Sequence, residues 1–230
     1  MERDVLLQIL DGFADDREDG RDAGPRLVDA CVDVLQVSGA GVMVMVDEEH
    51  RGMLGGSNTT IRATEALQFS LGEGPCVDTY RMGRPVLEPN LPDPVLARWP
   101  AFSAPAVLAG VGAIFAFPLQ IGAIRIGALD LYTTEPGDLS DAQFRDALIM
   151  AEVVTHAVLE LQAGAEPGAF ASELDVRPNR TIVHQASGML SVQLDLPISE
   201  AMGRLRGYAH QHGIPINDVA QDVVERRLLI

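Results

Sequence analysis

The segment over residues 180–230 constrains the fold most, because two proline-containing breaks divide it into three short helical stretches. The breaks fall at Pro197 and at Gly213–Ile214–Pro215. Proline cannot continue a helical hydrogen-bond ladder, and stretches this short are marginal as isolated helices, so the three must pack together. Residues at helical spacing give each stretch one packing face: Ile182, Ala186, Met189 and Gln193; Ala201, Met202, Leu205, Tyr208 and Ala209; Val219, Ala220, Val223, Val224 and Leu228.

Short motifs inside these stretches narrow the family. The first stretch reads IVHQASGML over 182–190, the second has Ala201 followed by LRGYA over 205–209, and the third has the pair Val219–Ala220. Together they resemble the ANTAR domain, a small RNA-binding antitermination module. The resemblance implies that the bundle binds stem-loops in nascent RNA. The family usually carries lysine where this chain has Ser187, so one basic contact is expected to be missing here.

Polar residues on the first two predicted helices are the expected RNA contacts. Arg180, His184 and Ser187 follow helical spacing and, with Ser191, are predicted to form a polar stripe opposite the apolar face. Arginine offers a planar fork for phosphate, and Tyr208 can either stack on an unpaired base or pack in the core. The predicted RNA-binding residues are Arg180, His184, Ser187, Arg204, Arg206 and Tyr208.

Charge is distributed unevenly along the chain, whose net charge is −16. From residue 175 onward six arginines balance six acidic residues, and the remaining 11 of 17 basic and 27 of 33 acidic residues precede them. An acidic N-terminal domain repels nucleic acid, whereas a neutral C-terminal part can bind it through local arginines. Arginines on a solvated helix surface would give the same counts, so charge alone does not establish nucleic-acid binding.

The sequence carries few signals that bear on cellular location or on metal binding. No run of 18 apolar residues occurs, and residues 1–4 open the chain with mixed charge, which predicts neither a membrane span nor a secretory signal. Cys31 and Cys76 are isolated thiols, which fit a reducing compartment and are too few for a cysteine-rich zinc site. The five histidines are scattered. We therefore expect a cytoplasmic protein without a metal site.

Residues 26–162 predict a sheet flanked by helices. The stretches 112–120 and 124–132 are almost continuously apolar, as expected for strands covered on both faces. Helical patterns precede and follow them at 26–37 and 141–162. The phrases GEGPCVDTYRMGRPV, FAFPLQIGAIRIGALDLY and PGDLSDAQ resemble those of GAF domains coupled to ANTAR domains, of the actinobacterial type.

The predicted fold class is therefore α+β, with an N-terminal GAF domain (an antiparallel sheet flanked by helices) followed by an all-α three-helix ANTAR bundle. The expected parts are an N-terminal helix and connector over 1–25, a GAF sensory domain over 26–162, a linker over 163–176 and the RNA-binding domain over 177–230. Apolar stripes on 1–13 and 141–162 exceed what one GAF core needs, which predicts a homodimer.

A GAF domain also implies a pocket for a small-molecule ligand. Its predicted lining is Met43, Met45, Cys76, Trp99, Phe115 and Phe117. These bulky side chains would fill much of its volume, and no attachment motif for bilin or haem is visible. We expect no cofactor, and purified protein without a visible absorption band; a stoichiometric Soret peak would contradict this.

The expected function is that of a signal-responsive regulator that promotes transcription antitermination, with the GAF domain as sensor or dimerisation module. No Ser–His–Asp order or credible carboxylate pair indicates an enzyme. Two other readings stay open: a signalling adaptor whose bundle binds protein, and a helix-turn-helix that reads duplex DNA, which the weak net charge of the bundle disfavours.

Overall fold

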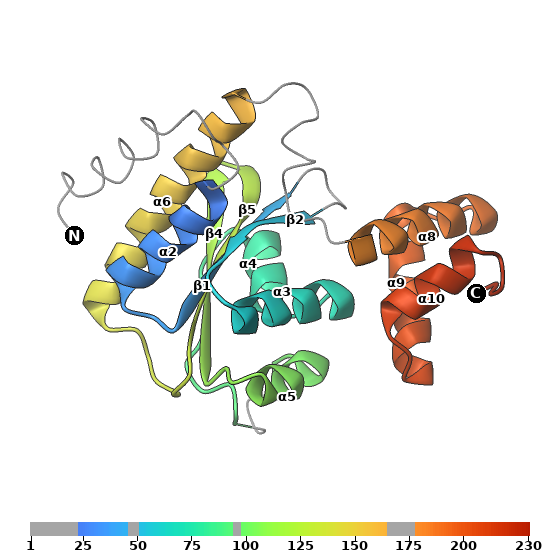
Figure 1. The fold of residues 1–230 in the computed structure, drawn as a ribbon, viewed down its shortest axis with the longest axis horizontal. Coiled ribbons are helices and arrows are strands. Elements are labelled where there is room, and N and C mark those ends of the chain that lie inside the picture. The colour runs from blue at the N-terminus through green and yellow to red at the C-terminus, as the bar shows by residue number, and fades with distance from the viewer. Residues whose placement is uncertain (1–22, 46–50, 94–97, 165–177) are drawn as a thin grey trace. The chain divides into compact units, whose positions relative to one another are not determined.

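The fold is seen in a computed structural model that describes residues 23–45, 51–93, 98–164 and 178–230 (Figure 1). The predicted helix at 1–13 lies outside these residues, as does the predicted linker apart from its first two positions. The sheet with its helices and the C-terminal helices form two compact units. Each unit is described by itself below.

The first unit is built on a five-stranded sheet with the strand order β2-β1-β5-β4-β3. Strand β5 lies at its centre and pairs antiparallel with β1 on one side and β4 on the other. Strand β3 pairs antiparallel with β4 at the far edge. The bounds are β1 Gly39–Met45, β2 Arg51–Gly56, β3 Val86–Glu88, β4 Ala113–Ile121 and β5 Ile124–Thr133.

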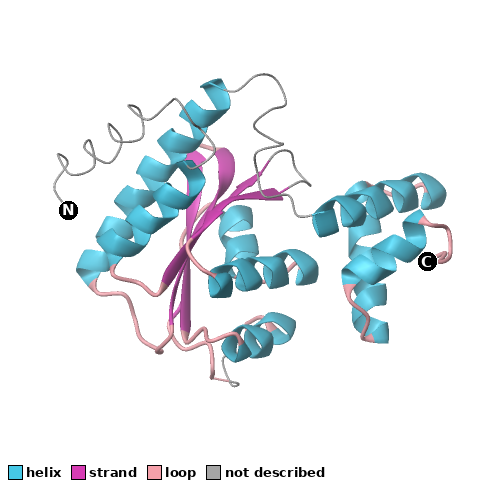
Figure 2. Cartoon of the chain, in the orientation of Figure 1, coloured by secondary structure: helices cyan, strands magenta, loops and turns pink. Residues whose placement is uncertain are grey.

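Helices cover both faces of this sheet, as the apolar strands predict (Figure 2). One face carries α2 (Ala23–Leu35) and α6 (Asp141–Gly164), and the other carries α3 (Thr59–Leu71), α4 (Pro75–Met82) and α5 (Pro100–Leu108). On the α6 face the rings of Phe117 and Phe144 lie 5.7 Å apart. Gln143 Nε2 also donates to the carbonyl of Leu35 at 3.0 Å, which ties α6 to the end of α2.

By length and composition alone, α6 is apolar enough to cross a membrane. Part of this apolar surface packs into the core of the first unit, however. Met150, Val154 and Val158 are fully buried on one side of the helix. A core helix of a globular domain passes the same composition test, so α6 gives no argument for a membrane span.

The strand period separates the predicted pocket residues onto two faces. Ile114 and Ala116 of β4 pack into the core under α3 and α5. Phe117 faces the opposite way, against α6, and Phe115 shares its side because alternate residues of a strand point alike. Phe115 and Phe117 therefore form the core between the sheet and α6, on the opposite face of the sheet from Met43 and Cys76, so the six predicted residues do not line a single pocket.

The second unit is a bundle of three helices: α8 Pro178–Leu194, α9 Ile198–His212 and α10 Ile216–Val224. All three pairs of helices are in contact. The breaks fall where the sequence predicts them. Gly213 ends α9 in the left-handed conformation, with φ 63°, and Pro197 and Pro215 stand at the N-caps of α9 and α10.

Cys31 provides a prediction for the first unit. Its side chain on α2 is fully buried, and burial raises the pKa of the thiol from 9.0 to about 12. Because only the thiolate is nucleophilic, we expect iodoacetamide at about pH 8 to leave Cys31 unlabelled in the folded chain and to label it in denaturant. The neutral thiol favours the fold below pH 9.0, and this contribution is lost as the pH rises towards 12. Peptide mass mapping checks the labelling; rapid native labelling of Cys31 would contradict its burial.

Candidate RNA-binding surface and a buried carboxylate–thiol site

The outer side of α9 combines a cation with two stacked rings. Arg204, Tyr208 and His212 follow at intervals of four residues and therefore lie along one side of the helix. Arg204 and His212 are exposed and Tyr208 is half-buried. The Tyr208 and His212 rings are stacked with their centroids 4.0 Å apart, and His212 Nδ1 lies 2.9 Å from the Tyr208 carbonyl oxygen. Tyr208 and His212 thus form a stacked pair of rings on the outer side of the bundle.

Two glycines leave the backbone of α9 uncovered beside this stripe. Gly203 and Gly207 are exposed, and a Cβ added at either would have no atom within 4 Å. Glycine inside a helix costs about 1 kcal/mol of stability relative to alanine. Because an added Cβ would meet nothing at either position, packing within the bundle does not require glycine there. A flat backbone surface next to a cation and an aromatic ring lets a large ligand approach closely.

The first helix of the bundle, α8, buries a different set of residues from the set that the sequence predicts. Val183, Ala186 and Leu190 are buried, whereas Ile182 and Met189 are only half-buried. Ser187 is fully buried as well, and its hydroxyl donates to the His184 carbonyl at 2.9 Å. The predicted exposed stripe through His184 and Ser187 is therefore wrong, because the helix turns Ser187 into the bundle core.

His184 and Arg206 are also set back from the surface. His184 is half-buried and both of its ring nitrogens are buried; the same holds for Arg206 and its Nε. These positions suit bracing of the bundle better than contact with a large ligand. The helix backbone places Arg180 in the first turn of α8, and its side chain lies outside the described residues.

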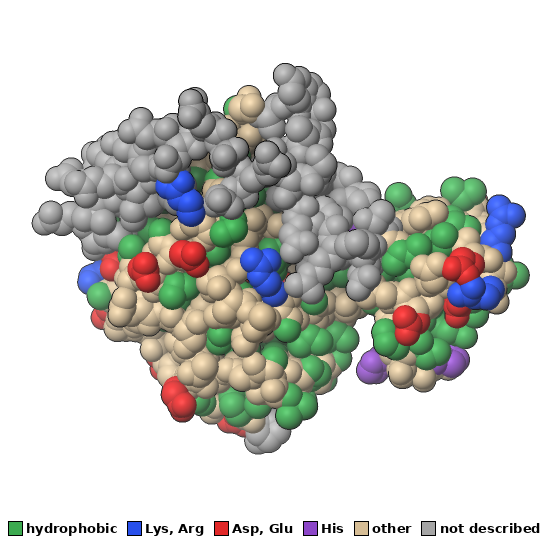
Figure 3. Space-filling model, in the orientation of Figure 1, with side chains coloured by type: hydrophobic (Ala, Val, Ile, Leu, Met, Phe, Trp, Pro, Cys, Tyr) green, Lys and Arg blue, Asp and Glu red, His purple; other side chains and the backbone are tan. Residues whose placement is uncertain are grey.

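The remaining charges of the bundle are mixed. Arg227 forms ion pairs with Asp222, at 2.7 Å, and with Glu225. On the visible face of the bundle, basic and acidic side chains are interspersed (Figure 3). Arg204 is exposed and makes no ion pair with any residue in the described part of the chain. Of the predicted contacts, the structure therefore places Arg204 and Tyr208 together on an open side of α9, with His212 as a neighbour that the sequence reasoning missed.

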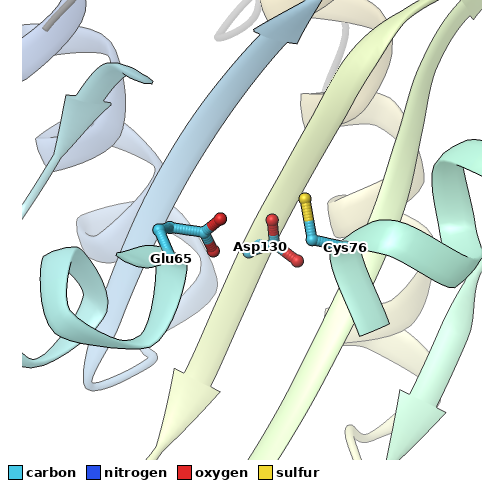
Figure 4. Close-up of side chains that lie close together, drawn as sticks. All are labelled: Glu65, Cys76 and Asp130. Carbon is cyan, nitrogen blue, oxygen red and sulfur yellow. The ribbon is translucent and has the colours of Figure 1, made fainter. Parts of the chain in front are cut away.

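The first unit contains a second candidate site, which lies between the sheet and the α3 and α4 helices. Glu65 of α3, Cys76 of α4 and Asp130 of β5 point towards one another (Figure 4). Their ligand atoms all lie within 4.8 Å of one another. The side chains are 1%, 4% and 0% exposed, respectively. Two carboxylates and a thiol thus meet in a place from which water is excluded.

Sheet register explains why this place can hold polar groups. Asp130 on the central strand is paired with Gly41 of β1 and Ala116 of β4. Small residues on both sides leave room above the Asp130 carboxylate for side chains that descend from the helices. Gly41 approaches α3 closely, since a Cβ there would meet Ile61 Cγ1 at 2.9 Å and Glu65 Cγ at 3.7 Å.

Gln68 connects the two helices of the site. Its Nε2 donates to Glu65 Oε1 at 3.0 Å, and its Oε1 accepts from the backbone N–H of Cys76 at 2.8 Å. The turn between the helices requires Gly74, which has φ 133° and whose added Cβ would lie 2.8 Å from Gln68 Cγ. This turn holds Cys76 at the start of α4, above Asp130.

The predicted pocket residues of this face are only partly brought together. Met43 and Cys76 form one apolar cluster with Met53 and Ala128. Trp99 packs elsewhere in the same layer, against Phe102, and its indole N–H donates to Asp78 at 3.0 Å. Met45 is half-buried at the end of β1. Sequence reasoning missed Glu65 and Asp130, although an aspartate inside the apolar run IRIGALDLY was a visible signal.

Solved structures with the same architecture are GAF domains and related proteins. The GAF domain of an Acinetobacter phosphoenolpyruvate-protein phosphotransferase is 16% identical, with a TM-score of 0.53 over 72% of this chain and 99% of that one. Free methionine-R-sulfoxide reductase of Neisseria meningitidis is 14% identical, with a TM-score of 0.51 over 71% of this chain and 91% of that one. At these identities the likeness concerns the fold alone. No curated protein matched the chain.

Family models match both units. The GAF domain model matches residues 19–158, which is more than half of the chain, and the ANTAR domain model matches residues 178–224. The sheet with helices on both faces and the three-helix bundle are the two folds that these families imply. The chain therefore belongs to the GAF family and carries an ANTAR domain after its GAF domain, the organisation of a GAF–ANTAR regulator.

Proposed function

We propose that this regulator binds stem-loops in nascent RNA through its ANTAR bundle and thereby promotes transcription antitermination. The observation that carries the proposal is the α9 surface, where exposed Arg204 lies on the same side as the stacked Tyr208 and His212 rings. The ANTAR match over the same helices supports it. The GAF unit serves as the sensor or dimerisation module.

The chemistry of this surface fits a hairpin loop better than a regular duplex. Specific RNA recognition relies on unpaired bases that stack on aromatic side chains, with arginine on the neighbouring phosphates. Tyr208 supplies the ring and Arg204 the cation, while Gly203 and Gly207 let a backbone come close. Among the described residues of the bundle, basic and acidic side chains are interspersed, so we expect few phosphate contacts and a modest dependence on salt.

This proposal extends to the oligomeric state of the protein and its location in the cell. We propose a cytoplasmic homodimer, whose GAF unit takes a small-molecule ligand of unidentified chemistry. Leu148, which is 38% exposed on α6, extends the apolar side of that helix beyond the sheet and is available to a second copy. Light scattering is expected to give the mass of a dimer, and a monomer at all concentrations would contradict this part of the proposal.

The binding proposal is tested with the full chain and a pool of RNA hairpins with randomised loops. We expect the protein to retain a set of hairpins on filters. Duplex DNA of the same sequences should not compete with these hairpins for binding. Tyr208→Ala should weaken binding of the selected hairpins roughly 10-fold or more, because an aromatic stack is worth about 1–3 kcal/mol per base. Equal binding of hairpin and duplex DNA would instead favour a helix-turn-helix.

A protein-binding adaptor remains the second candidate, and exposed apolar side chains favour it. Val192 is 84% and Leu229 80% exposed in the bundle. Val192→Ala is the matched variant that separates the two readings. If the protein is an RNA-binding regulator, Val192→Ala should leave its RNA binding unchanged and Tyr208→Ala should weaken it. If it is an adaptor that docks protein through Val192, Val192→Ala should reduce the protein captured in pull-downs and Tyr208→Ala should not.

A further inference from the structure

We propose that Glu65, Cys76 and Asp130 bind one zinc ion or a closely similar divalent transition-metal ion inside the GAF unit. The observation is the convergence of two carboxylates and a thiol, from α3, α4 and β5, within 4.8 Å of one another. Binding at this site is independent of the proposed RNA function, because its direct readout is the metal and not the RNA. It also revises the expectation of no metal site.

The burial of the three groups is the main physical argument. A buried carboxylate attracts a nearby cation strongly, because the low-dielectric interior screens the two charges little. Glu65 and Asp130 are 1% and 0% exposed and lie on facing elements. A divalent cation between them would neutralise both at once. A metal-free site, in which protons and hydrogen bonds hold the carboxyl groups, is an outcome that the experiment separates.

The donor set indicates which cation fits. Calcium and magnesium prefer cages of six or more oxygens, often including water. A thiolate together with two carboxylates suits zinc or another borderline metal, which takes sulfur, nitrogen and oxygen ligands in a four-coordinate site. The apolar cluster of Met43, Met53, Cys76 and Ala128 at the same place provides a dry, sulfur-rich wall.

Orientation of the ligands is already provided by neighbouring groups. Gln68 holds the Glu65 carboxylate through a 3.0 Å hydrogen bond and holds the backbone of Cys76 through a 2.8 Å bond. Such outer partners typically fix the ligands of protein metal sites. Three protein ligands leave a fourth position for water or for a small anionic or thiol ligand. A site of this kind would give the GAF unit a chemical input.

Metal binding would remove the thiol proton of Cys76, because only the thiolate ligates. The proton passes to solvent, so apparent affinity should rise with pH. Because the site is buried, the chain is loaded by refolding from denaturant with one equivalent of Zn²⁺, and a matched sample is refolded with chelator. Elemental analysis after gel filtration is expected to find one zinc per chain. Zinc should also raise the melting temperature of the GAF unit.

Cobalt provides the spectroscopic test of the ligands. The chain refolded with Co²⁺ should show a thiolate-to-cobalt charge-transfer band and the intense visible bands of a four-coordinate ion. Cys76→Ser and Asp130→Asn, which keep the size of each side chain, should abolish the charge-transfer band or weaken binding roughly 100-fold. Cys31→Ser, a buried thiol on the other face of the sheet, and His212→Ala, an exposed histidine, are the controls and should bind like the wild type.

Three results would overturn the proposal. They are less than stoichiometric zinc in the wild-type chain, cobalt bound without the thiolate band, and equal binding by the Cys76 and Asp130 variants. Each result is measured on the wild-type protein or on a near-isosteric variant. Thermal unfolding in the presence of chelator checks that each variant is folded. If the variants unfold, the cobalt spectrum of the wild type alone still decides. If Asp130→Asn is stably folded and zinc does not change the melting temperature, protons and hydrogen bonds hold the carboxyl groups, which do not bind the metal.

Discussion

Leu205→Ala is expected to unfold the C-terminal bundle while leaving the GAF unit folded. Leu205 is fully buried in α9, a helix that packs against both α8 and α10. Removing a buried leucine side chain costs about 2–5 kcal/mol, because apolar contacts are lost and a cavity remains. A unit of this size has a total stability of only a few kcal/mol, at about 0.05–0.15 kcal/mol per residue. The loss is therefore comparable to the whole free energy of unfolding of the bundle.

Circular dichroism during thermal unfolding measures this effect. The variant should lose the helical signal of the bundle at low temperature and keep the transition of the GAF unit, and RNA binding should disappear with the bundle. Val192→Ala is the matched control, since Val192 is 84% exposed and its loss should change stability little. A variant that melts like the wild type would mean that α9 does not pack as the structure has it.

Gly127→Ala is expected to destabilise the GAF unit by about 3 kcal/mol or more, at the upper end of what overpacking costs. Gly127 lies in the central strand β5, opposite Val44 of β1 and Leu119 of β4. A Cβ at this position would run into the Met43 carbonyl oxygen and would lie 3.1 Å from the Val44 Cα. Both are backbone atoms of a paired strand, so relief requires the sheet itself to move.

Chemical denaturation of the full chain checks the prediction, with the loss expected in the transition of the GAF unit. Gly203→Ala provides a control of opposite sign. Gly203 lies in α9, where an added Cβ meets nothing within 4 Å, and alanine there should stabilise the bundle by about 1 kcal/mol. A Gly127 variant as stable as the wild type would show that β1 and β5 are not in the observed register.

Continuous patterns made most of the architecture predictable. The strands at 113–121 and 124–133 follow from long apolar runs, and the helices on both faces follow from the absence of polar alternation. Pro197 and Gly213 mark real helix ends. In each case the information is local, because backbone chemistry or periodicity over a few residues decides the outcome.

Facing directions were less predictable. On α8 the buried side includes Val183 and Leu190 instead of Ile182 and Met189, so Ser187 turns inward. A helix with apolar residues at 182, 183, 186, 189 and 190 is compatible with either side, and only packing against α9 and α10 decides. Phe115 and Phe117 were grouped with Met43 and Cys76 for a related reason: a strand buried on both faces gives no sign of which side chains face α6 and which face α3 and α4.

The carboxylate–thiol site could not be assembled from the sequence. Glu65, Cys76 and Asp130 have no motif spacing, and they meet only because the register places Asp130 between Gly41 and Ala116. Asp130 broke an apolar strand and was the one residue that local rules could have marked. Its partners depend on how two helices cross the sheet, which no short-range pattern encodes.

The central claim, that the α9 surface binds RNA, is tested most directly by a salt titration of hairpin binding. The full chain is compared with Arg204→Ala and with Arg227→Ala, whose arginine is already engaged by Asp222 and Glu225. Loss of one phosphate contact should lower the dependence of log affinity on log salt by roughly 0.7–0.9 in the Arg204 variant. The Arg227 variant should keep the wild-type slope. If folded Arg204→Ala protein binds the hairpin with unchanged affinity and slope, α9 is not the RNA surface.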